Sequence, residues 1–152
     1  MEWKLIKFEE LTTKELYAIM KERVSIFVVE QQCPYHELDD YDQAAYHLFK
    51  ENEGEIIAYA RVLRHNIIYK EATIGRIIVK KEFRGSGLGR ELLERAIEFL
   101  ETELDEKVIK IQAQSYLKEF YSSFGFEPIS EIYLEDKIPH LDMKKGGLIV
   151  NC

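Results

Sequence analysis

The most constraining feature of this sequence is a glycine-rich loop between a strand-like segment and an amphipathic helix. Residues 73–80 are rich in isoleucine and valine, which is typical of a strand buried on both faces. The loop Arg-Gly-Ser-Gly-Leu-Gly follows at 84–89, and apolar residues then recur with helical spacing over 88–104. This order points several backbone N–H groups and the positive end of a helix dipole at one place. We therefore expect the loop to bind a phosphate group.

The spacing of the glycines separates the known kinds of phosphate loop. A Walker A loop needs Lys and Ser or Thr after its last glycine, whereas Gly89 is followed by Arg90. The dinucleotide fingerprint needs Gly-x-Gly-x-x-Gly in an early βαβ unit, whereas Gly85, Gly87 and Gly89 alternate and follow several other elements. ATP hydrolysis and dinucleotide binding are therefore disfavoured. A tight connection that uses glycine without binding a ligand stays open at this point.

The hydrophobic pattern predicts one α+β domain over residues 1–152, a mixed α/β layer without linker or repeat. Residues 30–43 match neither period and are expected to form an ordered loop or broken helix. We predict helices over 12–29, 88–104 and 116–124, and strands over 2–8, 46–50, 55–64, 73–80, 108–114, 126–133 and 140–144.

The charge balance narrows the classes of partner. The chain has 28 acidic and 21 basic residues and a formal net charge of −7, which repels phosphate backbones and anionic lipid. No apolar run approaches the ~20 residues of a membrane span. We therefore expect neither nucleic acid nor a membrane as partner.

The cysteines and histidines give no sign of a metal site. Cys33 and Cys152 form neither a CxxC pair nor a disulfide framework, which favours a reducing, cytoplasmic location. The histidines lack the spacing of metal ligands, so no metal is expected. These histidines are His36, His47, His65 and His140.

A family resemblance adds to this interpretation. The pattern Arg/Gln-x-x-Gly-x-Gly/Ala, met from Arg84 to Gly89, resembles the acetyl-coenzyme A (acetyl-CoA) pyrophosphate loop of the Gcn5-related N-acetyltransferase (GNAT) superfamily. Tyr121 stands four residues before Gly125-Phe126 and resembles the tyrosine signature of that superfamily. The segments 26–35, 111–114 and 135–140 are similar to its ElaA-like branch.

The resemblance implies a fold and an activity. The implied fold is a central, mostly antiparallel sheet flanked by helices. The implied activity is transfer of the acetyl group of acetyl-CoA to a primary amine of a small molecule or peptide, by direct attack within a ternary complex. The alternative is a domain that binds acyl-CoA as a sensor or structural partner without turnover. Whether the chain forms a homodimer stays open.

The resemblance also implies residue roles. Tyr121 resembles the general acid, with a half-buried tyrosine capping the core as the alternative. Glu30, His140 and a chain of waters are all open as the base. A backbone N–H near Ile78 or Val79 is expected to stabilise the oxyanion. The implied cofactor-binding residues are Ile77, Ile78, Val79, Arg84, Gly85, Ser86, Gly87, Leu88, Gly89, Arg90 and Gln114, the last standing where many members have asparagine.

An acidic run follows the first predicted helix. Glu37, Asp39, Asp40 and Asp42 lack the glycine and distal glutamate of a calcium-binding loop. The run is expected to be a solvated loop, with selection of a cationic amine acceptor as the alternative.

Overall fold

The computed structural model of the chain describes residues 2–32 and 36–146. The expectations that concern Cys33 and Cys152 lie outside these residues. The helices are α1 (Thr13–Arg23), α2 (Leu88–Glu98) and α3 (Lys118–Ser122). The strands are β1 (Trp3–Lys7), β2 (Tyr46–Asn52), β3 (Glu55–Leu63), β4 (Thr73–Val79), β5 (Ile109–Gln114), β6 (Glu127–Pro128), β7 (Tyr133–Glu135) and β8 (Ile138–Lys145).

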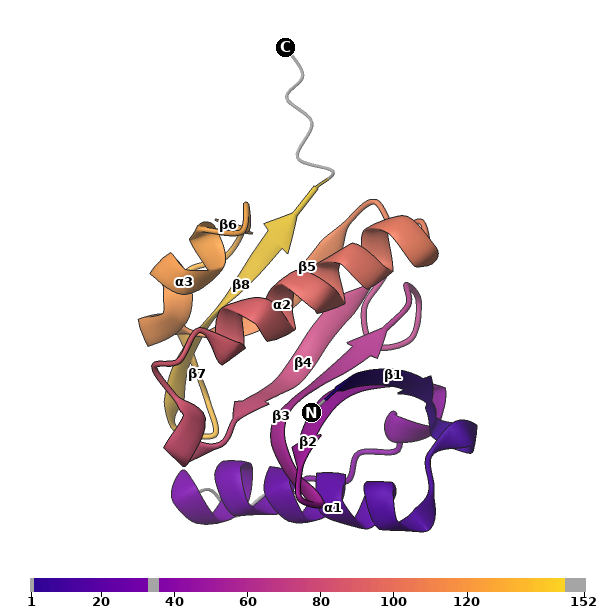
Figure 1. Cartoon of the computed structure of the whole chain (residues 1–152). Helices are drawn as coiled ribbons and strands as arrows, with labels where there is room; N and C mark the ends of the chain where they lie inside the picture. Colours follow the sequence, from indigo (N-terminus) through magenta and orange to yellow (C-terminus); the bar gives the residue numbers. More distant parts are fainter. Residues whose placement is uncertain (1, 33–35, 147–152) are drawn as a thin grey trace.

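The strands form two antiparallel sheets that meet at one point (Figure 1). The first sheet has the order β1-β2-β3-β4, and in the second β8 pairs with β5, β6 and β7. A parallel bridge between Ala72 and Ile109 joins the two, and the Lys110 N–H donates to the Ala72 carbonyl at 2.8 Å. The expected sheet of mostly antiparallel strands flanked by helices is therefore confirmed.

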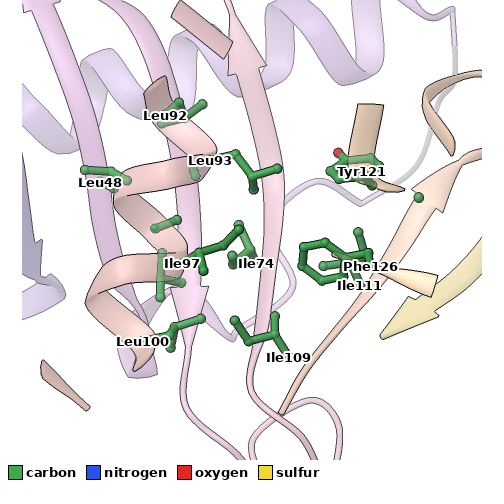
Figure 2. Close-up of a cluster of buried hydrophobic side chains, with 14 of the residues drawn as sticks. Leu48, Ile74, Leu92, Leu93, Ile97, Leu100, Ile109, Ile111, Tyr121 and Phe126 are labelled. Carbon is green, nitrogen blue, oxygen red and sulfur yellow. The ribbon is translucent and has the colours of Figure 1, made fainter. Parts of the chain in front are cut away.

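The two long helices cover opposite faces of the first sheet, because successive strand residues point to opposite sides. Leu48 packs in the core cluster that contains Leu92 and Leu93 of α2, which Figure 2 shows. Its neighbour Phe49 packs in the cluster that contains Ile19 of α1. The sheet is thus buried on both sides, and one end of the larger cluster is closed by Tyr121 and Phe126.

Helix α1 begins as its sequence predicts. The Glu15 N–H donates to Thr12 Oγ1 at 3.0 Å, and the Thr12 N–H donates to Glu15 Oε1 at 2.9 Å, a reciprocal cap. After Arg23 the helix widens into a π-helical segment, Val24–Glu30, which ends close to the expected residue 29. Glu30 therefore lies at the end of a rigid element.

Two expectations about strands are wrong. No strand spans 126–133, since β6 contains only Glu127 and Pro128 before the ladder stops. The Ile129 N–H still donates to the Asp142 carbonyl at 2.9 Å, but pairing with β8 resumes only at Tyr133, so residues 130–132 lie outside the ladder. In β4, Ile77 and Val79 are only half-buried, because β4 separates from β5 beyond the bridge and one face opens to a cavity.

Candidate active site

The divergence of β4 and β5 creates a cavity of about 790 Å³. Beyond the bridge at Ala72, no pairing joins the two strands within the described part of the chain. Ile77 and Val79 of β4 line one wall, and Ile111 and Gln114 of β5 line the other. The cavity therefore lies where two sheet edges separate, and unpaired backbone groups of both strands become available to a ligand.

A bulge in β4 shapes this cavity. Tyr59 pairs with Ile78 but Arg61 pairs with Gly75, so β4 has one extra residue at this point. Arg76, within the bulge, has a φ of 50°, in the left-handed region that side chains rarely adopt. Bulges redirect side chains, and this one brings Arg76 Nε within 2.8 Å of Glu37 Oε2.

The glycine loop forms a second, smaller cavity of about 340 Å³. Gly85 and Gly87 have φ values of 84° and 86°, and a Cβ at either position would meet no heavy atom within 4 Å. Gly87 is also the N-cap of α2, and no side chain caps its first N–H groups. These donors and the helix dipole suit an anion. The cavity is lined by Val79, Arg84, Gly85, Gly87, Gly89, Arg90 and Phe120.

The two arginines that flank the loop are both held by protein partners. Arg84 Nε donates to the Val79 carbonyl at 2.8 Å. Arg90 stacks on Phe124, with 4.5 Å from the guanidinium carbon to the ring centroid, and donates to Ser123 Oγ at 2.8 Å. The positive charges expected beside the loop are therefore in place.

The side chains of Ser86 and Leu88 line neither cavity, since Ser86 Oγ donates to the Phe83 carbonyl and Leu88 packs in the core.

Tyr121 lies on α3 at the edge of the large cavity. Its side chain is buried against Phe120 and Phe126, with ring centroids 5.4 and 6.1 Å away. The hydroxyl makes no hydrogen bond with any described residue. Burial raises the pKa of Tyr121 well above its usual value of about 10. The phenol is therefore a protonated group without a hydrogen-bond partner among the described residues.

His140 reaches the same cavity from β8. Its Nδ1 lies 2.7 Å from the Ile138 carbonyl, which only accepts, so this nitrogen is the donor, and in the neutral ring the lone pair is on Nε2. Nε2 makes no hydrogen bond with a described residue. The ring stacks on Tyr133 at 6.4 Å.

Tyr133 is held in place beneath His140. Its hydroxyl donates to Asp142 and accepts from Gln112 Nε2 at 3.0 Å. Burial and the Asp142 carboxylate raise the pKa of Tyr133 to about 12. The stacking partner of His140 is thus neutral and fixed in orientation.

The acidic run is not a solvated loop. Glu37 and Asp42 are buried, and Arg23, which has 0% exposure, binds both: its Nε lies 2.7 Å from Glu37 Oε2 and its Nη1 lies 2.6 Å from Asp42 Oδ1. Burial acts to raise the pKa of Asp39, but hydrogen bonds from Arg61 outweigh it and hold the pKa at about 2. Only Asp40 of the four carboxylates is exposed. Three arginines, Arg23, Arg61 and Arg76, therefore pair with the other three carboxylates of this run.

Some residues of the cavity escaped sequence reasoning. Arg61 lines the cavity, and it is the only charged residue between Ile56 and Leu63 in an apolar strand. A charged side chain in an apolar strand requires a charged partner when it is buried. The lone arginine in this strand is therefore a feature of the sequence from which a buried ion pair could have been predicted. His36, Tyr116 and Glu135 also line the cavity, and no local pattern indicates them.

Comparison with known proteins identifies the class. A family model described as an acetyltransferase (GNAT) domain matches residues 12–146, and the chain belongs to this family. The chain is 37% identical over 147 residues to protein ElaA of Escherichia coli K12, which covers 95% of the chain and 96% of ElaA. It is 39% identical over 139 residues to a UPF0039 protein of Schizosaccharomyces pombe, over 90% of the chain and 91% of that protein.

Solved structures agree with this assignment. An acyl-CoA N-acyltransferase from Pseudomonas aeruginosa superposes with a TM-score of 0.90 at 38% identity, over 96% of this chain and 100% of that one. The crystal structure of Escherichia coli ElaA superposes with a TM-score of 0.89 at 37% identity, over 95% and 99% of the two chains. The expected fold and the resemblance to the ElaA-like branch are therefore confirmed.

Two other kinds of feature are absent from the part of the chain that the structure describes. Over residues 2–32 and 36–146, no helix is long and apolar enough to cross a membrane. Within the same ranges, no three His, Cys, Asp or Glu side chains are grouped so that they could hold a metal ion.

Proposed function

We propose that the chain transfers the acetyl group of acetyl-CoA to a primary amine of a small molecule or peptide, by direct attack in a ternary complex. The observation that carries the proposal is that Val79, Arg84 and Gly89 line both cavities. The anion-binding loop therefore adjoins the cavity that contains Tyr121 and His140. This arrangement suits a ligand with a pyrophosphate at one end and a thioester at the other.

The loop and the start of α2 would hold the pyrophosphate. The uncapped N–H groups at the start of α2 would donate to the pyrophosphate in the smaller cavity. The charges of Arg84 and Arg90 lie beside this cavity. The thioester supplies the activated acyl group when bound. A backbone N–H of β4 near Ile78 or Val79 would stabilise the oxyanion at the wall of the large cavity.

His140 is the better placed of the two side chains proposed as base. The lone pair of Nε2 in the neutral ring is available to take a proton from the amine, while Glu30 is ion-paired with Arg84. Tyr121 would deliver a proton to the departing thiolate. Its raised pKa keeps the phenol protonated at neutral pH, and its hydroxyl has no competing partner among the described residues.

The test is release of free thiol from acetyl-CoA by the purified protein across a panel of amines. The panel contains an amino acid, a polyamine, a lysine peptide and an aromatic amine, and reactions without amine measure hydrolysis. Amine-dependent thiol release, with acetylated amine detected by mass spectrometry, supports the proposal. Tight binding of acetyl-CoA without release under any condition would instead indicate an acyl-CoA-binding or sensor domain.

A further inference from the structure

Arg84 connects two elements across the boundary between the cavities. Its Nε donates to the Val79 carbonyl at the end of β4, at 2.8 Å. Its Nη1 and Nη2 lie 3.2 and 3.3 Å from Glu30 Oε2 and Oε1, at the end of the π-helical segment. The guanidinium thus binds both oxygens of one carboxylate while it lines both cavities.

We propose that Glu30 is a positioning residue that holds Arg84 in this closed arrangement, and that the pyrophosphate of acetyl-CoA takes Arg84 away from it. The inference rests on the function proposed above. A guanidinium presents paired N–H groups that match a carboxylate and a phosphate equally well. Glu30 and the pyrophosphate therefore compete for one cation.

Because the Arg84–Glu30 pair is exposed, exchange of Glu30 for the pyrophosphate costs little free energy. The side chains of Arg84 and Glu30 are 42% and 44% exposed, so water can solvate either group when the pair opens. Exposed ion pairs of this kind contribute little, and the competition should be worth about two- to five-fold in affinity. The pair is weak enough to open on every cycle.

Opening the pair changes the large cavity as well. Glu30 lines that cavity, and its carboxylate loses its cation when Arg84 turns to the pyrophosphate. The negative charge of Glu30 therefore becomes more available to a cationic amine once the cofactor has bound.

The experiment is a double-mutant cycle on the Kd of acetyl-CoA, measured by calorimetry. The proteins are wild type, Glu30→Gln, Arg84→Gln and the double variant. Glu135→Gln is the matched control, because Glu135 lines the same cavity but does not bind Arg84. We expect Glu30→Gln to tighten binding two- to five-fold when Arg84 is present and to have no effect when Arg84 is Gln.

Two results would overturn the role of Glu30. One is an unchanged or weaker affinity of Glu30→Gln beside normal binding by the wild type. The other is an equal gain in the Arg84→Gln background or in Glu135→Gln, because the carboxylate would then act by general repulsion. A wild type that binds no acetyl-CoA would refute the proposed function itself, and the role of Glu30 with it.

Discussion

Arg61 binds Asp39 through two parallel hydrogen bonds, Nη1 to Oδ1 and Nη2 to Oδ2, each 2.8 Å long. The arginine lies near the end of β3 and is buried, while the carboxylate belongs to the loop that follows the π-helical segment. This contact attaches the loop to the sheet, and the pairs of Arg23 attach it to the end of α1. The wall of the large cavity that the loop forms is therefore held by buried charge.

Loss of this pair should cost stability. Asp39→Asn leaves the buried Arg61 with Asp42 as its remaining carboxylate and should lower the free energy of unfolding by about 2 kcal/mol. The loss should stay below the ~3–5 kcal/mol typical of fully buried pairs, because the Asp39 side chain is 24% exposed. Urea denaturation measures it, with the exposed neighbour variant Asp40→Asn as control. Equal stability of the two variants would show that the pair contributes nothing.

The buried His47 should make stability fall in acid. Burial lowers the pKa of His47, and the nearby Arg23 and Arg61 act in the same direction against Asp42. The neutral ring accepts from Tyr59 at 2.7 Å and donates to the Asp42 carbonyl at 3.0 Å. The unfolded chain takes up a proton near pH 6.5 and the folded chain does not, so stability is complete above pH 6.5 and is lost below it.

The measurement is the free energy of unfolding between pH 7.5 and 5. For the wild type it should fall by up to ~1.4 kcal/mol per pH unit below pH 6.5 from this one group. In His47→Gln, which can keep one donor and one acceptor, this part of the slope should disappear. An identical slope in both proteins would assign the acid sensitivity to other groups.

A side chain in the glycine loop should block the cofactor. Gly87→Glu places a Cβ and a negative charge at the start of α2, so the affinity for acetyl-CoA should fall by at least ~100-fold. The matched control is Gly54→Glu, because Gly54 also has a positive φ, 81° against 86°, and open space around it, yet lies in the β2–β3 turn. Both variants should lose similar stability, about 1 kcal/mol. If calorimetry finds equal affinities of Gly87→Glu and Gly54→Glu for acetyl-CoA, the glycine loop is not part of the cofactor site.

Removal of the Tyr121 hydroxyl should affect the chemical step alone. Tyr121→Phe keeps the packed ring, so the Kd of acetyl-CoA should stay nearly constant while kcat falls by ~10²–10⁴-fold. The raised pKa predicts no loss of wild-type rate from this group up to about pH 10. Tyr116→Phe, in the same cavity but 75% exposed, is the control and should stay active. Single-turnover rates that are unchanged in Tyr121→Phe would make the phenol structural.

The base can be identified by chemical rescue. His140→Ala should lower kcat by ~10²-fold or more, and added imidazole should restore part of the rate if the ring accepts the proton. Glu30→Gln is the comparison, since Glu30 is the other side chain considered as base. This variant should keep most of the wild-type rate of the chemical step. A large loss in Glu30→Gln together with an active His140→Ala would reverse the assignment.

Local patterns predicted the elements whose causes are local. The cap formed by Thr12 and Glu15 sets the start of α1, and the apolar repeat after Gly87 sets α2. The strand expected over 126–133 was wrong because residues 130–132 leave the ladder after β6, and pairing with β8 resumes only at Tyr133. The hydrophobic periodicity of one segment does not determine which residues of another strand it pairs with.

The amino-acid order was sufficient for the glycine loop, the tyrosine signature and the family, because each depends on residues that are neighbours in the chain. The fate of the acidic run depended on tertiary contacts. Asp39 is paired with Arg61, 22 positions away, and with Arg76, 37 positions away. A run of carboxylates in an isolated segment is solvated, and only the folded sheet brings buried guanidinium groups to it. The same folding joins Glu30 to Arg84 over 54 positions, so charge pairing in this cavity is a property of the assembled fold.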